Sequence, residues 1–124
     1  MINEIQKLQF ELMRKATFNG FDGNVVVDSL EDKLHQELWE GVIMDREGYG
    51  HIDLIKLRDI QNGFWNIDTL FILCKKGKEK EVELLALRNW NADEVEVLSL
   101  EDTQKLMGIG SREDKRRIVR CWWD

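Results

Sequence analysis

The sequence predicts an α/β fold, with α+β as the alternative, built as one domain around a mixed sheet of about five strands flanked by helices. Three observations predict this class. Two early stretches repeat apolar residues at helical spacing, several later stretches are rich in β-branched and aromatic residues, and strand and helix patterns alternate after residue 65. Such alternation favours helices packed on a sheet. The 124 residues fit a single domain, spanning residues 1–124 in the order ααβββαβαβ.

Helical periodicity defines the first two elements. Over residues 2–18 the apolar side chains gather in one arc of a helical wheel, and the charged side chains lie elsewhere, which predicts an amphipathic helix. The arc contains Ile2, Ile5, Leu8, Leu12, Met13 and Ala16. A turn at residues 19–23 follows. Asp22 or Asn24 can cap a second helix, which we expect to reach about Trp39 and to end at Gly41.

The middle of the chain predicts strands. Apolar residues 42–44 and 52–57 surround a polar turn at residues 45–50, which favours a hairpin over a helix. Residues 65–74 are rich in strand formers and end in a continuous apolar run at residues 70–74. Such a run is typical of a strand buried on both faces, so we predict that it is the central strand of the sheet.

The second half of the chain alternates helix and strand. A charged loop and a helix over residues 75–90 lead to a strand at residues 95–98, which we expect to run parallel to the central strand through a right-handed crossover. Ser99 begins a capping box for a short helix that Gly108 ends. Residues 118–123 share a helical face but are rich in strand formers, and we favour an edge strand.

Composition limits the classes of protein and of ligand. The longest purely apolar run is five residues, far below the roughly 20 needed to span a bilayer, and the N-terminus has no apolar stretch of signal-peptide type. The two cysteines, Cys74 and Cys121, lack metal-type spacing, so we expect reduced core thiols. These features predict a cytoplasmic protein with no membrane association and no cofactor.

Charge is unevenly spread along the chain. Residues 75–80 carry four lysines and one glutamate, and residues 112–120 carry five basic and two acidic side chains, so each segment has a local charge of +3. Because the whole chain carries −6, the rest of it carries −12. Two such segments on one side of the fold form a basic patch suited to an anion or a nucleic acid, whereas apart they are only solvated loops. The candidate anion-binding residues are Lys75, Lys76, Lys78, Arg116 and Arg117.

A second candidate site surrounds the polar turn. Three carboxylates and an imidazole fall within nine residues, a composition that suits a divalent cation or general acid–base chemistry. The candidate metal ligands are Asp45, Glu47 and Asp53, and the candidate catalytic residues are His51, Asp53 and Lys75. The alternative is a solvated acidic hairpin. We expect a binding or regulatory module rather than an enzyme, with a small metal-dependent hydrolase as the alternative.

The order of three strands, a crossover helix and a strand over about residues 42–98 resembles the core of the restriction-endonuclease-like nuclease family. The resemblance implies that Asp53 and Lys75 occupy two positions that bind metal and orient a phosphate in that family. The segment Leu73-Cys74-Lys75 lacks the second carboxylate of the family's motif. Unless Asp68 or Glu47 supplies that group, the resemblance implies a non-catalytic relative that binds nucleic acid.

Two adjacent tryptophans lie near the C-terminus. On a strand, Trp122 and Trp123 point to opposite faces, so only one of them enters the core. The other is exposed, covered by the first helix or buried in a partner. Because an edge strand has free backbone groups that a second copy can pair with, we expect a homodimer contact through this C-terminal segment.

Overall fold

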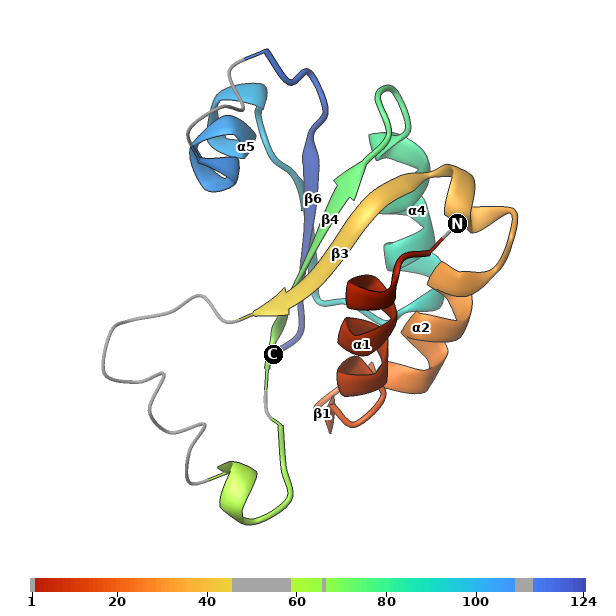
Figure 1. The fold of residues 1–124 in the computed structure, drawn as a ribbon, viewed down its shortest axis with the longest axis vertical. Coiled ribbons are helices and arrows are strands. Elements are labelled where there is room, and N and C mark those ends of the chain that lie inside the picture. Colours follow the sequence, from red (N-terminus) through yellow and green to blue (C-terminus); the bar gives the residue numbers. More distant parts are fainter. Residues whose placement is uncertain (1, 46–58, 66, 109–112) are drawn as a thin grey trace.

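The structure is a computed structural model that describes residues 2–45, 59–65, 67–108 and 113–124. Its main element is a four-stranded antiparallel sheet in the order β3-β4-β6-β5 (Figure 1). The strands are β3 (Trp39–Asp45), β4 (Thr69–Cys74), β5 (Glu94–Val97) and β6 (Ile118–Trp122), and a separate hairpin contains β1 (Thr17–Phe18) and β2 (Phe21–Asp22). The helices are α1 (Glu4–Met13), α2 (Gly23–Glu31), the 3₁₀ turn η1 (His35–Glu37), α4 (Glu79–Asn89) and α5 (Leu100–Met107). The predicted fold class is confirmed in its mixed α+β form.

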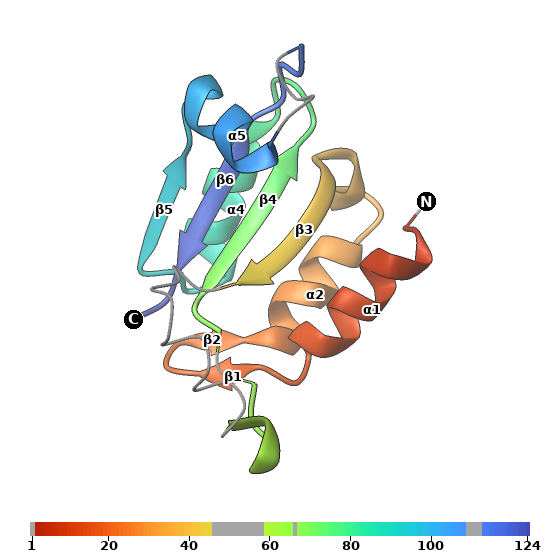
Figure 2. The same cartoon turned by 60° about the vertical axis from the view of Figure 1, so that its left-hand side comes forward.

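The helices divide unequally between the two faces of the sheet. Figure 2 shows α5 in front of the sheet and α4 behind it, and α1 and α2 lie with α4 on the side that we call the inner face. Side chains that alternate along the strands fill the core on this face: Val42, Met44, Leu70, Ile72, Cys74, Val119 and Cys121. None of the helices among the described residues is long and apolar enough to cross a membrane.

The predicted central strand is confirmed, with one correction. β4 pairs with β3 on one side and with β6 on the other, and Leu70 and Ile72 are completely buried. However, Phe71 and Leu73, which point to the other face, are only half-buried. The strand is therefore not fully buried on both faces, because α5 covers only one end of the outer face (Figure 2).

The predicted edge strand at the C-terminus is wrong. β6 lies between β4 and β5 and pairs with both. β5 runs in the same direction as β4, as predicted, but β6 separates the two strands, so no neighbouring strands in the described sheet are parallel. The physical reason is that Ile118, Val119 and Cys121 are all buried, and a strand with buried side chains on both faces suits an interior position.

The second helix ends earlier than the periodicity predicts. α2 stops at Glu31, η1 follows, and Trp39 begins β3, so Gly41 lies within a strand instead of ending a helix. Asp32 ends α2, because its side chain accepts a hydrogen bond from the Leu34 N–H (2.9 Å) and so stabilises a turn in competition with the helix. The predicted Asp22 cap is confirmed, because its carboxylate accepts hydrogen bonds from the Asn24 and Val25 N–H groups of α2.

The first helix buries only part of its predicted apolar arc. α1 buries Phe10 and Met13, whereas Ile5, Leu8 and Leu12 are exposed. A helix normally packs through its apolar arc. Here α1 lies beside β3, an edge strand, and two glutamines on the side facing that strand hydrogen-bond to its backbone. With this polar contact at β3, the side of the helix that carries Ile5, Leu8 and Leu12 faces away from the core.

Two later elements agree with the sequence. Ser99 accepts a hydrogen bond from the Asp102 N–H (3.0 Å) and begins α5 as predicted. Gly108, at a φ of 85°, ends that helix in a conformation that glycine adopts without a steric cost. The predicted strand at residues 52–57, and the turn before it from residue 46 onward, lie outside the described residues.

Candidate anion-binding site

The sheet register brings the two basic segments together. The Cys74 N–H donates to the Arg117 carbonyl oxygen (3.0 Å), and Leu73 lies opposite Ile118. Lys75 and Arg116 therefore leave neighbouring strands at the same end of the sheet. We call this region the basic end and define it by the five residues predicted as anion-binding: Lys75, Lys76, Lys78, Arg116 and Arg117.

The five cations differ in how far they are already neutralised. Arg116 pairs with Asp114 (2.7 Å), and hydrogen bonding from this guanidinium lowers the pKa of the Asp114 carboxyl to about 2. Lys78 lies 3.8 Å from a carboxylate oxygen of Glu81, and both side chains are exposed. Such surface pairs hold a cation only weakly.

The other three cations, Arg117, Lys75 and Lys76, form no ion pair with a carboxylate among the described residues. The Arg117 Nε donates to the Leu98 carbonyl oxygen (2.8 Å), a neutral partner that fixes the side chain without cancelling its charge. Among the described residues, no ion pair involves Lys75 or Lys76. These two lysines are therefore the cations most available to an incoming anion.

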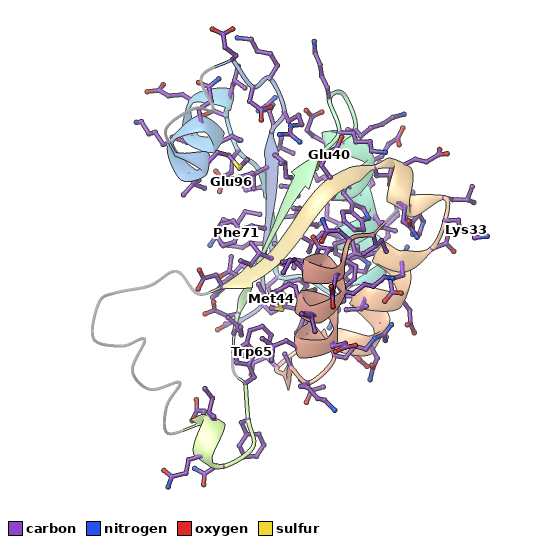
Figure 3. The ribbon with its side chains drawn as sticks, viewed as in Figure 1. Lys33, Glu40, Met44, Trp65, Phe71 and Glu96 are labelled. Carbon is purple, nitrogen blue, oxygen red and sulfur yellow. The ribbon has the colours of Figure 1, made fainter. Side chains whose placement is uncertain are left out.

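A polar cavity of about 340 Å³ adjoins the basic end. The Lys75 N–H donates to the Leu38 carbonyl oxygen (2.9 Å), which joins the end of β4 to the start of β3 and places Lys75 on the cavity wall. Figure 3 shows Lys33 and Glu40, which come from the segment after α2 and from β3 and also line the cavity. The other lining residues are Ile2, Asn3, Gln6, Gln36, Glu37 and Trp39. The cavity thus offers cations, carboxylates and carboxamides around one tryptophan.

Sequence reasoning missed part of this site. Lys33, Gln36 and Glu40 are distant in sequence from residue 75 and reach the cavity only because η1 and β3 meet the end of β4. Lys33 was isolated among residues assigned to a helix, so no local pattern singled it out. Charge runs identify a site only where its cations are consecutive in the chain.

The structure does not bring the metal and catalytic candidates together. Glu47, His51 and Asp53 lie outside the described residues. Asp45 pairs in register with Thr69, at the opposite end of β4 from Lys75, so about 20 Å of strand separates the two. No group of three or more metal-binding side chains occurs in the part of the chain that the structure describes.

Asp68 lies far from Lys75, and the two cysteines are buried. The Asp68 carboxylate accepts a hydrogen bond from the Thr69 hydroxyl (2.8 Å) at the start of β4, again far from Lys75. Cys74 and Cys121 are buried free thiols, as predicted, and burial raises the pKa of Cys74 to about 12 and raises the pKa of Cys121 as well. Thiols held in the neutral form are poor nucleophiles.

Trp122 and Trp123 point to opposite faces of the sheet, as the alternation along a strand predicts. Trp123 is completely buried, its Nε1–H donates to the Trp90 carbonyl oxygen (3.0 Å), and its ring packs edge-on against Phe21 at 4.7 Å between centroids. Trp123 is thus a core residue and not an interface residue. Trp122 is half-buried on the outer face and is the only one of the pair still available for a contact.

Comparisons with known proteins do not add to this geometry. No protein-family model matches the chain, and neither the curated proteins nor the solved structures gave a match. The resemblance to restriction-endonuclease-like nucleases stays a prediction.

Proposed function

We propose that the protein is a non-enzymatic binding module of the cytoplasm, which holds a phosphate-bearing polyanion, with nucleic acid as the expected class, at the basic end. One observation carries the proposal: the backbone bond from Cys74 to Arg117 joins two segments that each carry +3 in a chain of net charge −6. A local positive field on an acidic body attracts polyanions and orients them toward one surface. The buried free thiols of Cys74 and Cys121 support the location, because such thiols are typical of reducing compartments.

The available cations set the strength of binding. Lys75 and Lys76 contribute most, because Arg116 and Lys78 have carboxylate neighbours. Glu37 and Glu40 on the adjoining cavity wall oppose deep entry of a phosphate. We therefore expect surface binding at the level of non-specific nucleic-acid contacts, with a Kd of about 10⁻⁴ to 10⁻⁶ M at physiological salt.

Fluorescence anisotropy with a labelled single-stranded DNA of about 20 nucleotides tests the proposal. Phosphate contacts release counterions, so the affinity should fall steeply between about 50 and 200 mM salt. The double variant Lys75→Glu/Lys76→Glu should weaken DNA binding at least about tenfold. It should also reduce the salt dependence of the affinity, because two of the phosphate contacts are lost.

A matched control separates this site from net charge. Lys15→Glu/Arg88→Glu changes the total charge by the same amount, but its residues lie on exposed surfaces near the C-terminal ends of α1 and α4. This control should bind DNA within about threefold of the wild type. Absence of binding at low salt, binding that resists high salt, or equal losses in the two double variants would refute the proposal.

The proposal includes a homodimer, but not through strand pairing at the C-terminus. β6 is bonded on both sides, and Trp123 is buried, so neither offers the free edge that the sequence predicted. A dimer therefore needs a different surface.

A further inference from the structure

The polar cavity beside the basic end has unpaired charges of both signs on its wall. Two are cations and two are carboxylates: Lys33, Lys75, Glu37 and Glu40. In the part of the chain that the structure describes, none of the four forms an ion pair, although all of them line one space. The cavity therefore has a charge-balanced wall on which opposite charges are held apart.

The backbone keeps these charges on separate stretches of the chain. Lys33 comes from the segment after α2, Glu37 from η1, and Glu40 from the start of β3. Figure 3 shows Lys33 and Glu40 on these different elements. Lys75 follows β4, and the bond from its N–H to the Leu38 carbonyl oxygen (2.9 Å) fixes the segment that carries it. A molecule that carries both signs of charge can bridge the lysines and the glutamates without moving the backbone.

The uncharged part of the wall is already fixed by contacts within the protein. The Gln6 carboxamide accepts from the Val42 N–H and donates to the Val42 carbonyl oxygen, both at 2.8 Å. Trp39 is 7% exposed, and its Nε1–H donates to the Leu30 carbonyl oxygen (3.0 Å). Its ring packs edge-on against Phe10, with 5.6 Å between centroids. Trp39 therefore offers a rigid aromatic surface for the carbon skeleton of a ligand, and the polar recognition falls to the four charged side chains.

We propose that this cavity binds a small zwitterion of the amino-acid class. The carboxylate of the ligand is bound by Lys33 and Lys75, and its ammonium is bound by Glu37 and Glu40, through charge-assisted hydrogen bonds. The glutamates repel a polyanion and the lysines repel a polycation, whereas one charge of each sign satisfies both pairs.

The size of the cavity agrees with this class of ligand. Its volume of about 340 Å³ lies at the lower end of the range of about 300–1,000 Å³ that is usual for ligand pockets, and this favours a small molecule over a large cofactor. The inference goes beyond the proposed polyanion site, with which it shares only Lys75.

Titration of the ¹⁵N-labelled full chain, followed by NMR, tests the site. The probes are the common L-amino acids, each added up to about 10 mM. At least one should shift the Lys75 amide and the Trp39 indole N–H signals in a saturable way. Its N-acetyl derivative lacks the ammonium and its amide derivative lacks the carboxylate. Each derivative should bind at least about tenfold more weakly, because a hydrogen bond to a charged group is lost.

Two substitutions assign the two ends of the ligand. Lys33→Gln should weaken the amino acid at least about tenfold and leave its amide derivative unchanged, because that derivative has no carboxylate to lose. Glu37→Gln should weaken the amino acid equally and leave the N-acetyl derivative unchanged. The matched controls are Lys105→Gln and Glu101→Gln, whose exposed side chains lie on α5 and outside the cavity wall. Both controls should bind the amino acid within about twofold of the wild type.

Three results would overturn the inference. They are the absence of a saturable shift with every amino acid, a blocked derivative that binds as tightly as its parent, and losses in Lys33→Gln and Glu37→Gln no larger than in the controls. The NMR spectra of all four variants should keep the wild-type dispersion, which shows that they fold. DNA binding is measured separately by anisotropy on the wild type, so failure of one proposal leaves the other standing.

Discussion

Replacing Gln6 or Gln9 by methionine should give a graded loss of stability. Methionine has nearly the shape and helix propensity of glutamine but forms no strong hydrogen bond. Gln6 makes two hydrogen bonds to the edge of β3 and Gln9 makes one. At a net 0.5–1.5 kcal/mol for each bond, Gln6→Met should cost about 1–3 kcal/mol and Gln9→Met about half as much. Both contacts are part-buried, so water can replace only some of the hydrogen bonding that the backbone groups of β3 lose.

Urea unfolding measures the two losses, and amide hydrogen exchange locates them. Gln6→Met should speed exchange of the Val42 N–H and leave that of Met44 protected, whereas Gln9→Met should do the reverse. Lys7→Met, on an exposed position of the same helix, controls for the added methionine and should change stability by less than about 0.5 kcal/mol. The reasoning is refuted if the two glutamine variants lose equal stability, or if neither changes the protection of its partner amide.

Three further predictions concern the core and the basic end. Ile72→Ala should lower the free energy of unfolding by about 2–5 kcal/mol, because the side chain is fully buried at the centre of the sheet, and a loss below about 1 kcal/mol in urea unfolding would contradict that position. Trp123→Ala should cost about 3–5 kcal/mol and Trp122→Ala clearly less, since only the first is in the core; equal losses would argue against opposite faces. The lowered pKa of Asp114 means that its carboxylate adds stability above about pH 4, a contribution lost as the pH falls through 2. The stability difference between wild type and Asp114→Asn should therefore shrink as acid is added, and a difference that is constant down to pH 2 would refute this linkage.

Local chemistry in the sequence was a reliable guide to where elements begin and which strand is central. Asp22 and Ser99 cap α2 and α5 because a short polar side chain satisfies free N–H groups without any tertiary contact. The apolar run of β4 indicated an interior strand, because Leu70 and Ile72 are buried on one face and Phe71 and Leu73 are half-buried on the other. Such signals depend on neighbours in sequence, and so one sequence suffices to read them.

Strand order was not predictable in the same way. Residues 118–122 show strand propensity, but nothing local distinguishes pairing with one neighbour from pairing with two. Residues 75–78 and 116–117 of the site could be recognised in the sequence as charge runs. That the two runs lie side by side depends on the register between β4 and β6, which the sequence does not show. The contribution of Lys33 depends further on how η1 is placed against Lys75.

The first helix shows why periodicity alone misplaces a face. Its apolar arc predicts an amphipathic helix, yet Gln6 and Gln9 form the side that meets β3, because an edge strand presents polar backbone groups and not an apolar surface. The same two glutamines also cover part of this edge against pairing with a second chain. Gln6→Met frees the Val42 N–H and carbonyl oxygen at this edge, so a second chain can add to β3, and the variant should form species that keep growing with concentration. If sedimentation shows that Gln6→Met associates no more than the wild type, the carboxamide stabilises β3 without protecting its edge.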